Sequence, residues 1–353
     1  MTFNPRRLST ARKRRLLNKR GFAKALGVTE HTVMRWEKSE TEPEPDMLEA
    51  IAKLLRFPKE FFLGEDLDMP ETASFRSYTT MTAAIRDASL SAGALGFMLS
   101  DWVEEQFNLP KIQLPDLHLY KPEEAARVLR TEWGLGEKPI TNMLHLLESK
   151  GVRVLALAEN TVKVNAYSIW RAGKPYVFLN NYKSAESSRF DAAHELGHLV
   201  MHQDGGSTGR EAEDQANRFA SSFLMPRADV VAVIPRVSYL EQIIRAKARW
   251  RVSAAALAYR LRQLGIITEW KYRDLVIEMS SKGYNKNEPA PIERERSVIW
   301  QKVLTQLWAD KTTQLHIAKH LNLPEEEING LIFGVTATTD RPPQSSGLFV
   351  VEA

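Results

Sequence analysis

The residues with the clearest chemical potential are two histidines and a glutamate in the segment 189–202. His194 and His198 are four residues apart, so on a helix they project from one face, and both imidazoles can bind a single ion. Glu195 is rotated from that face by about a quarter of a turn. There it can take a proton from a metal-bound water and pass it to a leaving amine. Three protein ligands and a polarised water are typical of a catalytic zinc site, so this spacing predicts one.

The sequence around these residues predicts a largely buried helix, because the flanking residues are Ala193, Leu196, Leu199, Val200 and Met201. A buried helix that carries polar side chains needs a reason, since unpaired polar groups in a core are costly. The alternative is a chance match, in which the two histidines are ordinary, partly buried side chains. The chain contains no cysteine, so any metal must bind to His, Asp or Glu.

The third ligand must come from outside this helix. His194 and His202 lie about 12 Å apart along a straight helix, so the three rings cannot meet one ion, and we expect His202 beside the site or on the surface. Residues 211–225 predict a second helix, and antiparallel packing about 8–10 Å away would return an acid from its first turn. Glu213 is the best candidate, because it shares a face with small or apolar residues suited to a close helix contact. The solvent-facing alternatives are Glu211 and Asp214.

The N-terminal segment predicts a helix-turn-helix unit. Asn18 can cap a helix that ends at Gly27, and Thr29 can cap a second helix over residues 30–37, which in such units enters the major groove of DNA. Residues 1–29 hold nine Lys or Arg and no acid, as expected for a surface that faces phosphates. A solvated charged face is the alternative. The residues that we expect to contact DNA are Lys19, Glu30, His31, Thr32, Met34 and Arg35.

Residues 7–63 resemble the Xre/Cro-type repressor domains. The resemblance is carried by Leu-Gly-Val-Thr at 26–29, by Val33, by Arg-Trp-Glu at 35–37 and by Pro43. It implies a helical bundle that binds a double-stranded DNA operator. Because a fold does not fix a function, the alternative is a domain kept for dimerisation or for docking a protein partner.

The two helices of the expected metal site resemble those of the ImmA/IrrE metallopeptidases, in which His-Glu-x-x-His is followed by Glu-x-x-Ala-Asn-x-Phe-Ala and Leu-Met-Pro. The resemblance implies that His194, His198 and Glu213 bind one zinc ion per chain and that Glu195 is the general base. It extends more loosely over residues 74–334. Members with an N-terminal Xre-type domain are a familiar arrangement, and such proteins are associated with cleaving repressors of mobile elements or stress genes.

Segments rich in Val, Tyr and Leu predict a small sheet ahead of the site, with strands at 152–157, 162–170 and 175–179. In many zinc peptidases an exposed strand edge holds the substrate by backbone pairing, and residues 175–179 are the nearest candidate. Tyr167 and Asn165 could polarise a substrate carbonyl, although a tyrosine in a strand more often serves packing. Arg189 and Asp191 could support the metal ligands from behind, but the pattern favours a plain pair on the helix surface.

Together these patterns predict a mostly helical protein with an α+β core: an N-terminal helix-turn-helix bundle, a zincin-like metallopeptidase domain with a small three-stranded sheet, and a C-terminal helical region. Residues 317–321 predict part of a packed helical pair. Core anchors are expected at Trp250, Trp270, Trp300 and Trp308. The expected domains are residues 5–66 (helix-turn-helix), 67–139 (helical linker), 140–235 (metallopeptidase), 236–335 (C-terminal helices) and 336–353 (flexible tail).

Composition indicates the cellular location of the protein. The absence of cysteine fits a reducing compartment, and no apolar stretch has signal-peptide or membrane-spanning length, so we expect a cytoplasmic protein without membrane contact. We expect a site-specific zinc endopeptidase tethered to an operator, with a repressor or another regulatory protein as its substrate and a homodimer as one possible assembly. The alternative is a non-proteolytic repressor or antitoxin that senses a metal or a peptide. Glu195 favours the enzyme, because a sensor needs ligands but no base.

Overall fold

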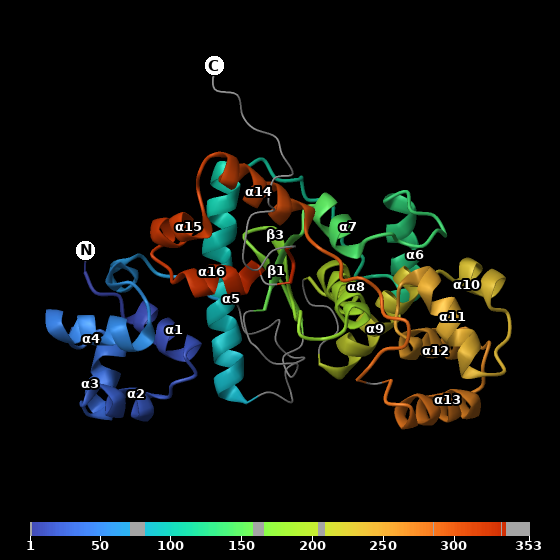
Figure 1. Cartoon of the computed structure of the whole chain (residues 1–353), viewed down its shortest axis with the longest axis horizontal. Coiled ribbons are helices and arrows are strands. Elements are labelled where there is room, and N and C mark those ends of the chain that lie inside the picture. Colours follow the sequence, from blue (N-terminus) through green and yellow to red (C-terminus); the bar gives the residue numbers. More distant parts are fainter. Residues whose placement is uncertain are drawn as a thin grey trace, which may run out of the picture.

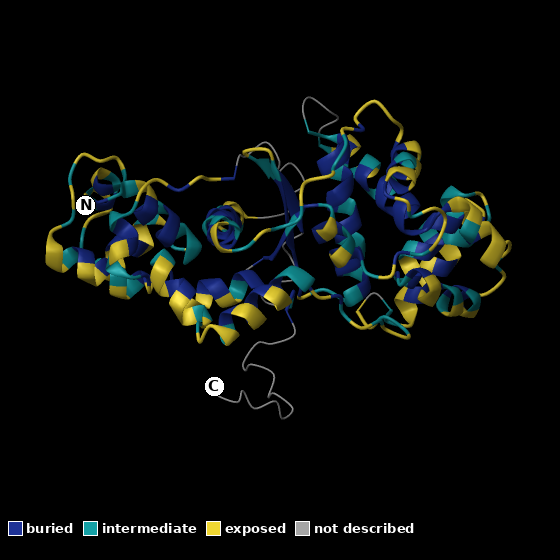
Figure 2. Ribbon diagram, turned by 90° about the horizontal axis from the view of Figure 1, so that it is seen from above, coloured by how far each residue is buried: buried dark blue, intermediate teal, exposed yellow. Residues whose placement is uncertain are grey.

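The computed structural model describes residues 2–70, 82–157, 166–203, 209–284, 286–332 and 334–336. Within these residues the chain is mostly helical and contains a small three-stranded mixed sheet, which confirms the predicted fold class. Figure 1 shows an elongated molecule, with the N-terminal helices at one end, the helices of residues 227–281 at the other and the sheet between them. Seen from above, buried residues line the middle of the molecule (Figure 2). No helix in the described ranges is long and apolar enough to cross a membrane.

The N-terminal bundle consists of α1 (Pro5–Arg14), α2 (Lys19–Leu26), α3 (Glu30–Glu37), α4 (Pro45–Leu55) and the 3-10 turn η1 (Lys59–Leu63). Its helix caps are the predicted ones: the Asn18 side chain accepts from the N–H of Gly21, and that of Thr29 accepts from the N–H of Thr32. Gly27 ends α2 with φ 70°, in the left-handed region that favours glycine. Buried apolar side chains fill the space between these helices, so the predicted helix-turn-helix is confirmed.

The sheet contains β1 (Arg153–Ala156), β2 (Tyr167–Arg171) and β3 (Lys174–Leu179) in the order β1-β3-β2. β1 runs parallel to β3, and β2 runs antiparallel to it. Ala172 and Gly173 join β2 to β3 with φ values of 48° and 72°, the left-handed backbone that a two-residue hairpin turn requires. The expectation of an exposed edge at residues 175–179 is wrong, because β3 is the central strand. In the described part of the chain, β1 and β2 are the edge strands.

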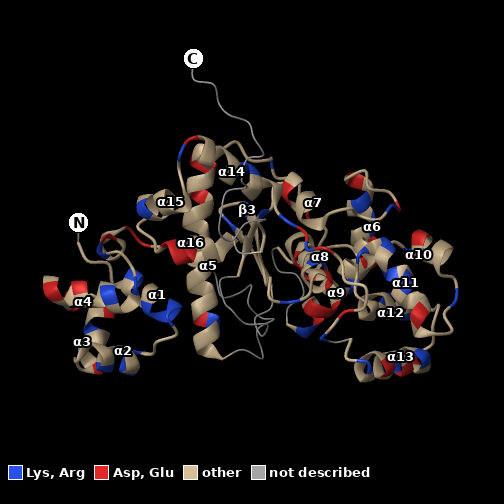
Figure 3. Cartoon of the chain, viewed as in Figure 1, with Lys and Arg blue, Asp and Glu red and all other residues tan. Residues whose placement is uncertain are grey.

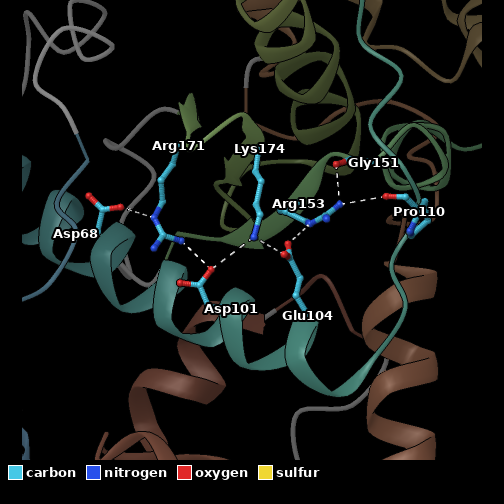
Figure 4. A network of polar contacts seen from close by, with 8 residues as sticks. All are labelled: Asp68, Asp101, Glu104, Pro110, Gly151, Arg153, Arg171 and Lys174. Carbon is cyan, nitrogen blue, oxygen red and sulfur yellow. Dashed lines mark hydrogen bonds and ion pairs between the residues drawn. The ribbon is translucent and has the colours of Figure 1, made fainter. Parts of the chain in front are cut away.

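Acidic residues of the long buried helix α5 (Ala83–Gln106) fix all three strands to that helix (Figure 4). Arg171 at the end of β2 donates to Asp101 at 2.8 Å, Lys174 at the start of β3 pairs with Glu104, and Arg153 at the start of β1 donates to Glu104 at 2.7 Å. Burial raises the pKa of Glu104, but the bonds from Lys174 and Arg153 outweigh it, so the pKa is lowered. The carboxylate is therefore ionised, and charge as well as packing positions the sheet.

Two antiparallel helices, α8 (Ala185–Met201) and α9 (Arg210–Leu224), pack face to face beside the sheet, with α6 (Pro122–Glu132) and α7 (Met143–Ser149) next to them (Figure 1). Gly197 of α8 permits this close approach. A Cβ at this position would lie 3.0 Å from Cδ1 of Phe219 and 3.4 Å from Cα of Ala216, both on α9. The glycine within the histidine motif therefore sets the distance between the two helices.

Arg189 of α8 is a core residue, and the expected surface pair with Asp191 is wrong. Its side chain is buried and its guanidinium pairs with Glu295. Glu295 also accepts the N–H of Met143 at 2.8 Å, at the start of α7. Asp191 pairs instead with Lys183 at 2.7 Å. A buried arginine with a partner 106 residues away cannot be recognised from the local pattern on α8.

The helices after α9 pack in two places. α10 (Arg227–Val233), α11 (Leu240–Trp250), α12 (Ala254–Gln263) and α13 (Glu269–Ser281) lie beyond α9, whereas α14 (Val298–Ala309), α15 (Gln314–Leu321) and α16 (Glu325–Ile332) return towards α5 (Figure 1). α15 and α16 form the predicted packed pair. Glu327 of α16 pairs with Arg14, the last residue of α1, at 2.8 Å and with Arg15, directly after that helix, at 2.5 Å, which ties the N-terminal bundle to the rest of the molecule.

The four tryptophans expected in the core differ in their exposure. Trp250 and Trp300 are buried, as predicted, and Trp308 is half-buried. Trp270 lies on α13 and is 74% exposed, so its expected core role is wrong. Trp270 lies between Glu269 and Lys271 in sequence, and this side of α13 faces solvent.

Candidate metal centre

The candidate site lies where α8 and α9 face each other. α8 presents His194 and His198 one turn apart, and α9 presents Glu213 from its first turn. The Nε2 atoms of the two histidines are 3.1 Å apart, Glu213 Oε2 lies 3.4 Å from His194 Nε2, and Glu213 Oε1 lies 3.3 Å from His198 Nε2. Within the described residues these three side chains form the one group of His, Asp or Glu that could hold a metal ion.

The donors and their separations fit a small divalent cation. Two imidazole nitrogens and one carboxylate form a common ligand set for such an ion. Donors at about 2.0–2.1 Å from a tetrahedral ion lie about 3.4 Å from one another. The measured separations of 3.1, 3.3 and 3.4 Å are close to this value. Three protein donors leave a fourth tetrahedral position open, which a catalytic metal requires.

Charge complementarity holds the three side chains together. Burial raises the pKa of Glu213, but the hydrogen bonds from His194 and His198 outweigh it and hold the pKa well below its ordinary value. Burial lowers the pKa of His194, whereas Glu213, Glu195 and Asp191 raise it, and the carboxylates have the larger effect. The acids around the rings therefore create a negative potential that favours a cation between them.

Asn217 of α9 orients the ring of His194. Asn217 Oδ1 lies 3.1 Å from His194 Nδ1. Because a carbonyl oxygen only accepts, Nδ1 of the ring carries a proton, and Nε2 is the nitrogen that can bind a metal ion in place of its hydrogen bond to Glu213. Nε2 is the ring atom that faces Glu213 and His198. The amide of Asn217 thus leaves Nε2 of His194 as a metal donor.

The ring of His198 is oriented by a chain of hydrogen bonds that runs through His202 to α9. The Gln215 Nε2–H donates to Glu211 Oε1 at 3.2 Å, which leaves Gln215 Oε1 to accept from His202 Nε2 at 2.9 Å. His202 Nδ1 therefore accepts from His198 Nδ1 at 2.9 Å, and Nε2 of His198, which faces Glu213, is the ring nitrogen that can bind a metal ion. Burial lowers the pKa of His202, which keeps that ring neutral. His202 thus lies beside the site, one of its two expected positions.

Glu195 is turned towards β2 and is not part of the group of three donors. Ser168 Oγ–H of β2 donates to Glu195 Oε2 at 2.7 Å, and Trp170 Nε1–H donates to the Leu199 carbonyl at 3.1 Å. The edge strand β2 is therefore bonded to α8 on both sides of His198. Ser168 is not among the residues predicted from the sequence, although strand alternation places it and Trp170 on the face opposite Tyr167.

Tyr167 does not face the candidate site. It is buried, its ring stacks on Phe178 with centroids 4.6 Å apart, and its hydroxyl donates to the Ser89 carbonyl of α5 at 3.4 Å. The suggested role in polarising a substrate carbonyl is therefore wrong, and the packing alternative is correct. Asn165 lies outside the described residues.

The side chains expected to contact DNA differ in exposure. The exposed ones are Glu30, His31 and Arg35, and the half-buried ones are Lys19, Thr32 and Met34. Arg35 lies 3.9 Å from Glu40, and Lys19 pairs with Glu37 at 3.4 Å. Figure 3 shows that α1 and α2 also carry Lys and Arg residues. The exposed side of α3 therefore offers polar and cationic groups to a ligand.

Two family models match separate parts of the chain. Residues 147–262 match the Peptidase M78 family, described as an IrrE N-terminal-like domain, and this range contains β1 to β3, α8 and α9. Residues 8–62 match a helix-turn-helix family and contain α2, α3 and α4. No curated protein matches the chain. The chain therefore contains an N-terminal segment that matches helix-turn-helix domains and a central segment that matches the IrrE-like domain of the Peptidase M78 family.

Proposed function

We propose that the protein is a DNA-binding regulator with zinc-dependent, site-specific endopeptidase activity, which acts in the cytoplasm on a repressor or another regulatory protein. The observation that carries the proposal is the convergence of His194, His198 and Glu213, with Glu195 on the helix of the two histidines. The match to a peptidase family supports it. The experiment that tests the proposal compares cells carrying the wild-type chain with cells carrying Glu195→Gln. We expect a protein that is cleaved in the first cells and stays intact in the second.

The proposed catalytic roles use side chains of α8 and α9. His194, His198 and Glu213 would hold one Zn²⁺ per chain, and the bound ion would polarise a water molecule and the substrate carbonyl. Glu195 takes a proton from the attacking water and delivers it to the leaving amine. Ser168 donates to Glu195 Oε2, and Oε1 of that carboxylate has no protein partner in the described ranges, so it is left for the proton.

The edge strand β2 is our proposed guide for the substrate backbone. In the described part of the chain β2 pairs only with β3, so its other edge has backbone groups that an extended peptide can bond. β2 also carries Ser168 and Trp170, which bond α8. A peptide added at this edge would therefore lie next to the helix that carries Glu195.

His202→Ala is expected to weaken zinc binding roughly 10–100-fold, the usual cost of losing a group that orients a metal ligand. Without His202, Nδ1 of His198 has no acceptor that fixes its proton there. Competition with a chromophoric chelator measures the affinity. His145→Ala, at an exposed histidine on α7, is the matched control and should match wild type. Equal zinc affinity of His202→Ala and wild type would remove His202 from the site.

We propose that Lys19, Glu30, His31, Thr32, Met34 and Arg35 contact the operator. Arg35→Ala is expected to weaken specific DNA binding by about 1–3 kcal/mol, because an exposed arginine on a recognition helix can bond a base edge. Gel-shift titration at fixed salt measures the loss. Lys53→Ala removes an exposed cation from α4 and should leave specific binding unchanged. A footprint and affinity identical to wild type in Arg35→Ala would contradict this placement of α3 in the groove.

A further inference from the structure

A cavity of about 570 Å³ adjoins the candidate metal centre. Its walls come from the first half of α8, from α9 and from α12. Asn217 lines the cavity and also bonds His194, so the cavity begins beside that ring. Asp191, three residues before His194, and Asp214, directly after Glu213, line it too. A side chain of a peptide bound at the metal centre can therefore enter this cavity.

The acids of the cavity are not equally neutralised. Asp191 pairs with Lys183 at 2.7 Å, and both side chains are largely covered. The side chain of Asp214 is 61% exposed, and its nearest cation is Arg218 at 3.8 Å. The Arg218 guanidinium is already bonded to both oxygens of Glu123, at 2.9 and 3.0 Å. Asp214 is thus the more exposed and less closely paired of the two acids of the cavity, on a helix whose acidic residues stand out in Figure 3.

Apolar surface lies beside this charge. Phe190, Ala256 and Tyr259 are half-buried and line the cavity. Burial and the nearby Asp214 raise the pKa of Tyr259, so its hydroxyl stays protonated. A cavity with aromatic and methyl walls and a carboxylate suits a long aliphatic stem that ends in a cation. Lysine and arginine have that structure.

We propose that this cavity is a substrate subsite that receives a lysine or arginine side chain next to the peptide bond that is cut. The proposal rests on the endopeptidase function proposed above and adds the class of substrate residue. An acidic side chain would meet the charge of Asp214, and a short apolar side chain would leave the cavity largely unfilled. Asp214 is the residue that determines specificity.

Binding of two hydroxamates to the zinc-loaded full chain tests the subsite without requiring turnover. Lysine hydroxamate and norleucine hydroxamate share the α-amine and the four-carbon stem, and only the first carries an ammonium group at the end of its side chain. We expect lysine hydroxamate to bind on the order of tenfold more tightly, because a charged hydrogen bond to Asp214 is added. In Asp214→Asn the ratio of the two affinities should fall to about one. Asp274→Asn removes an acid from α13 and is the matched control, in which the ratio should persist. Isothermal titration calorimetry gives both affinities.

Several results would overturn the subsite: no binding of either compound, equal affinity of the two in the wild-type chain, or a ratio that survives Asp214→Asn. A peptide library separates this proposal from the hydrolytic function. If the wild-type chain cuts no peptide but the hydroxamate ratio depends on Asp214, the subsite stands and hydrolysis fails. If peptides are cut with no preference for lysine or arginine beside the cleaved bond, hydrolysis stands and the subsite fails.

Discussion

Glu195→Gln is expected to abolish proteolysis while zinc binding, folding and DNA binding stay unchanged. The amide has almost the same shape as the carboxylate and can still accept the hydrogen bond from Ser168, but it cannot take a proton from water. Loss of a general base typically costs about 10²–10⁴-fold in rate. Because Glu195 lies outside the group of three donors, the metal content should equal that of the wild-type chain.

Comparison of the proteomes of cells that carry the wild-type chain or Glu195→Gln measures this prediction and identifies the substrate. The cleaved protein, once purified, gives the loss in kcat/KM directly. Glu241→Gln, at the first turn of α11, removes an acid far from the site in sequence and is the matched control. Equal cleavage by wild type and Glu195→Gln would exclude Glu195 as the base. If neither protein cleaves and operator binding persists, the non-proteolytic regulator is the better account.

The metal centre could be anticipated from the sequence because helical periodicity alone determines most of its geometry. A spacing of four residues places His194 and His198 on one face of any helix. Glu213 was chosen because it shares a face with Ala216 and Asn217, and the structure brings it to both rings. The small residue that lets the helices meet, Gly197, lies inside the motif itself.

Features that depend on distant segments could not be predicted in this way. β3 is the central strand because it pairs in parallel with β1, which is distant from it in sequence. The predicted exposed edge at residues 175–179 is therefore wrong. Ser168 bonds Glu195 from a strand 27 residues earlier, and no local pattern marks that contact. Arg189 has a charged side chain that favours the surface, and only its partner Glu295 makes burial favourable.

The N-terminal bundle also combines local features, which could be predicted, with distant contacts, which could not. Caps and turn residues such as Asn18, Gly27 and Thr29 act within a few positions, and the helix-turn-helix was predicted from them. The anchoring of α1 to α16 through Glu327 joins residues more than 300 positions apart and has no local signal. The DNA contacts stay predictions, because exposure on α3 shows which side chains are available and not what they bind.

Glu213→Ala is expected to remove zinc from the protein. Two histidines alone would remain as ligands, and structural and catalytic zinc sites in proteins use at least three protein donors. Glu213 is also the carboxylate that attracts the cation, since both rings bond it. Glu278→Ala, at an acid of α13 outside the site, should leave zinc content unchanged.

The most direct test of the account is therefore the zinc content per chain of the purified wild-type protein and of Glu213→Ala, measured by mass spectrometry of the metal. The account predicts about one zinc per wild-type chain and almost none in the variant. A wild-type chain that binds no zinc, or a Glu213→Ala chain that keeps its full content, would contradict it.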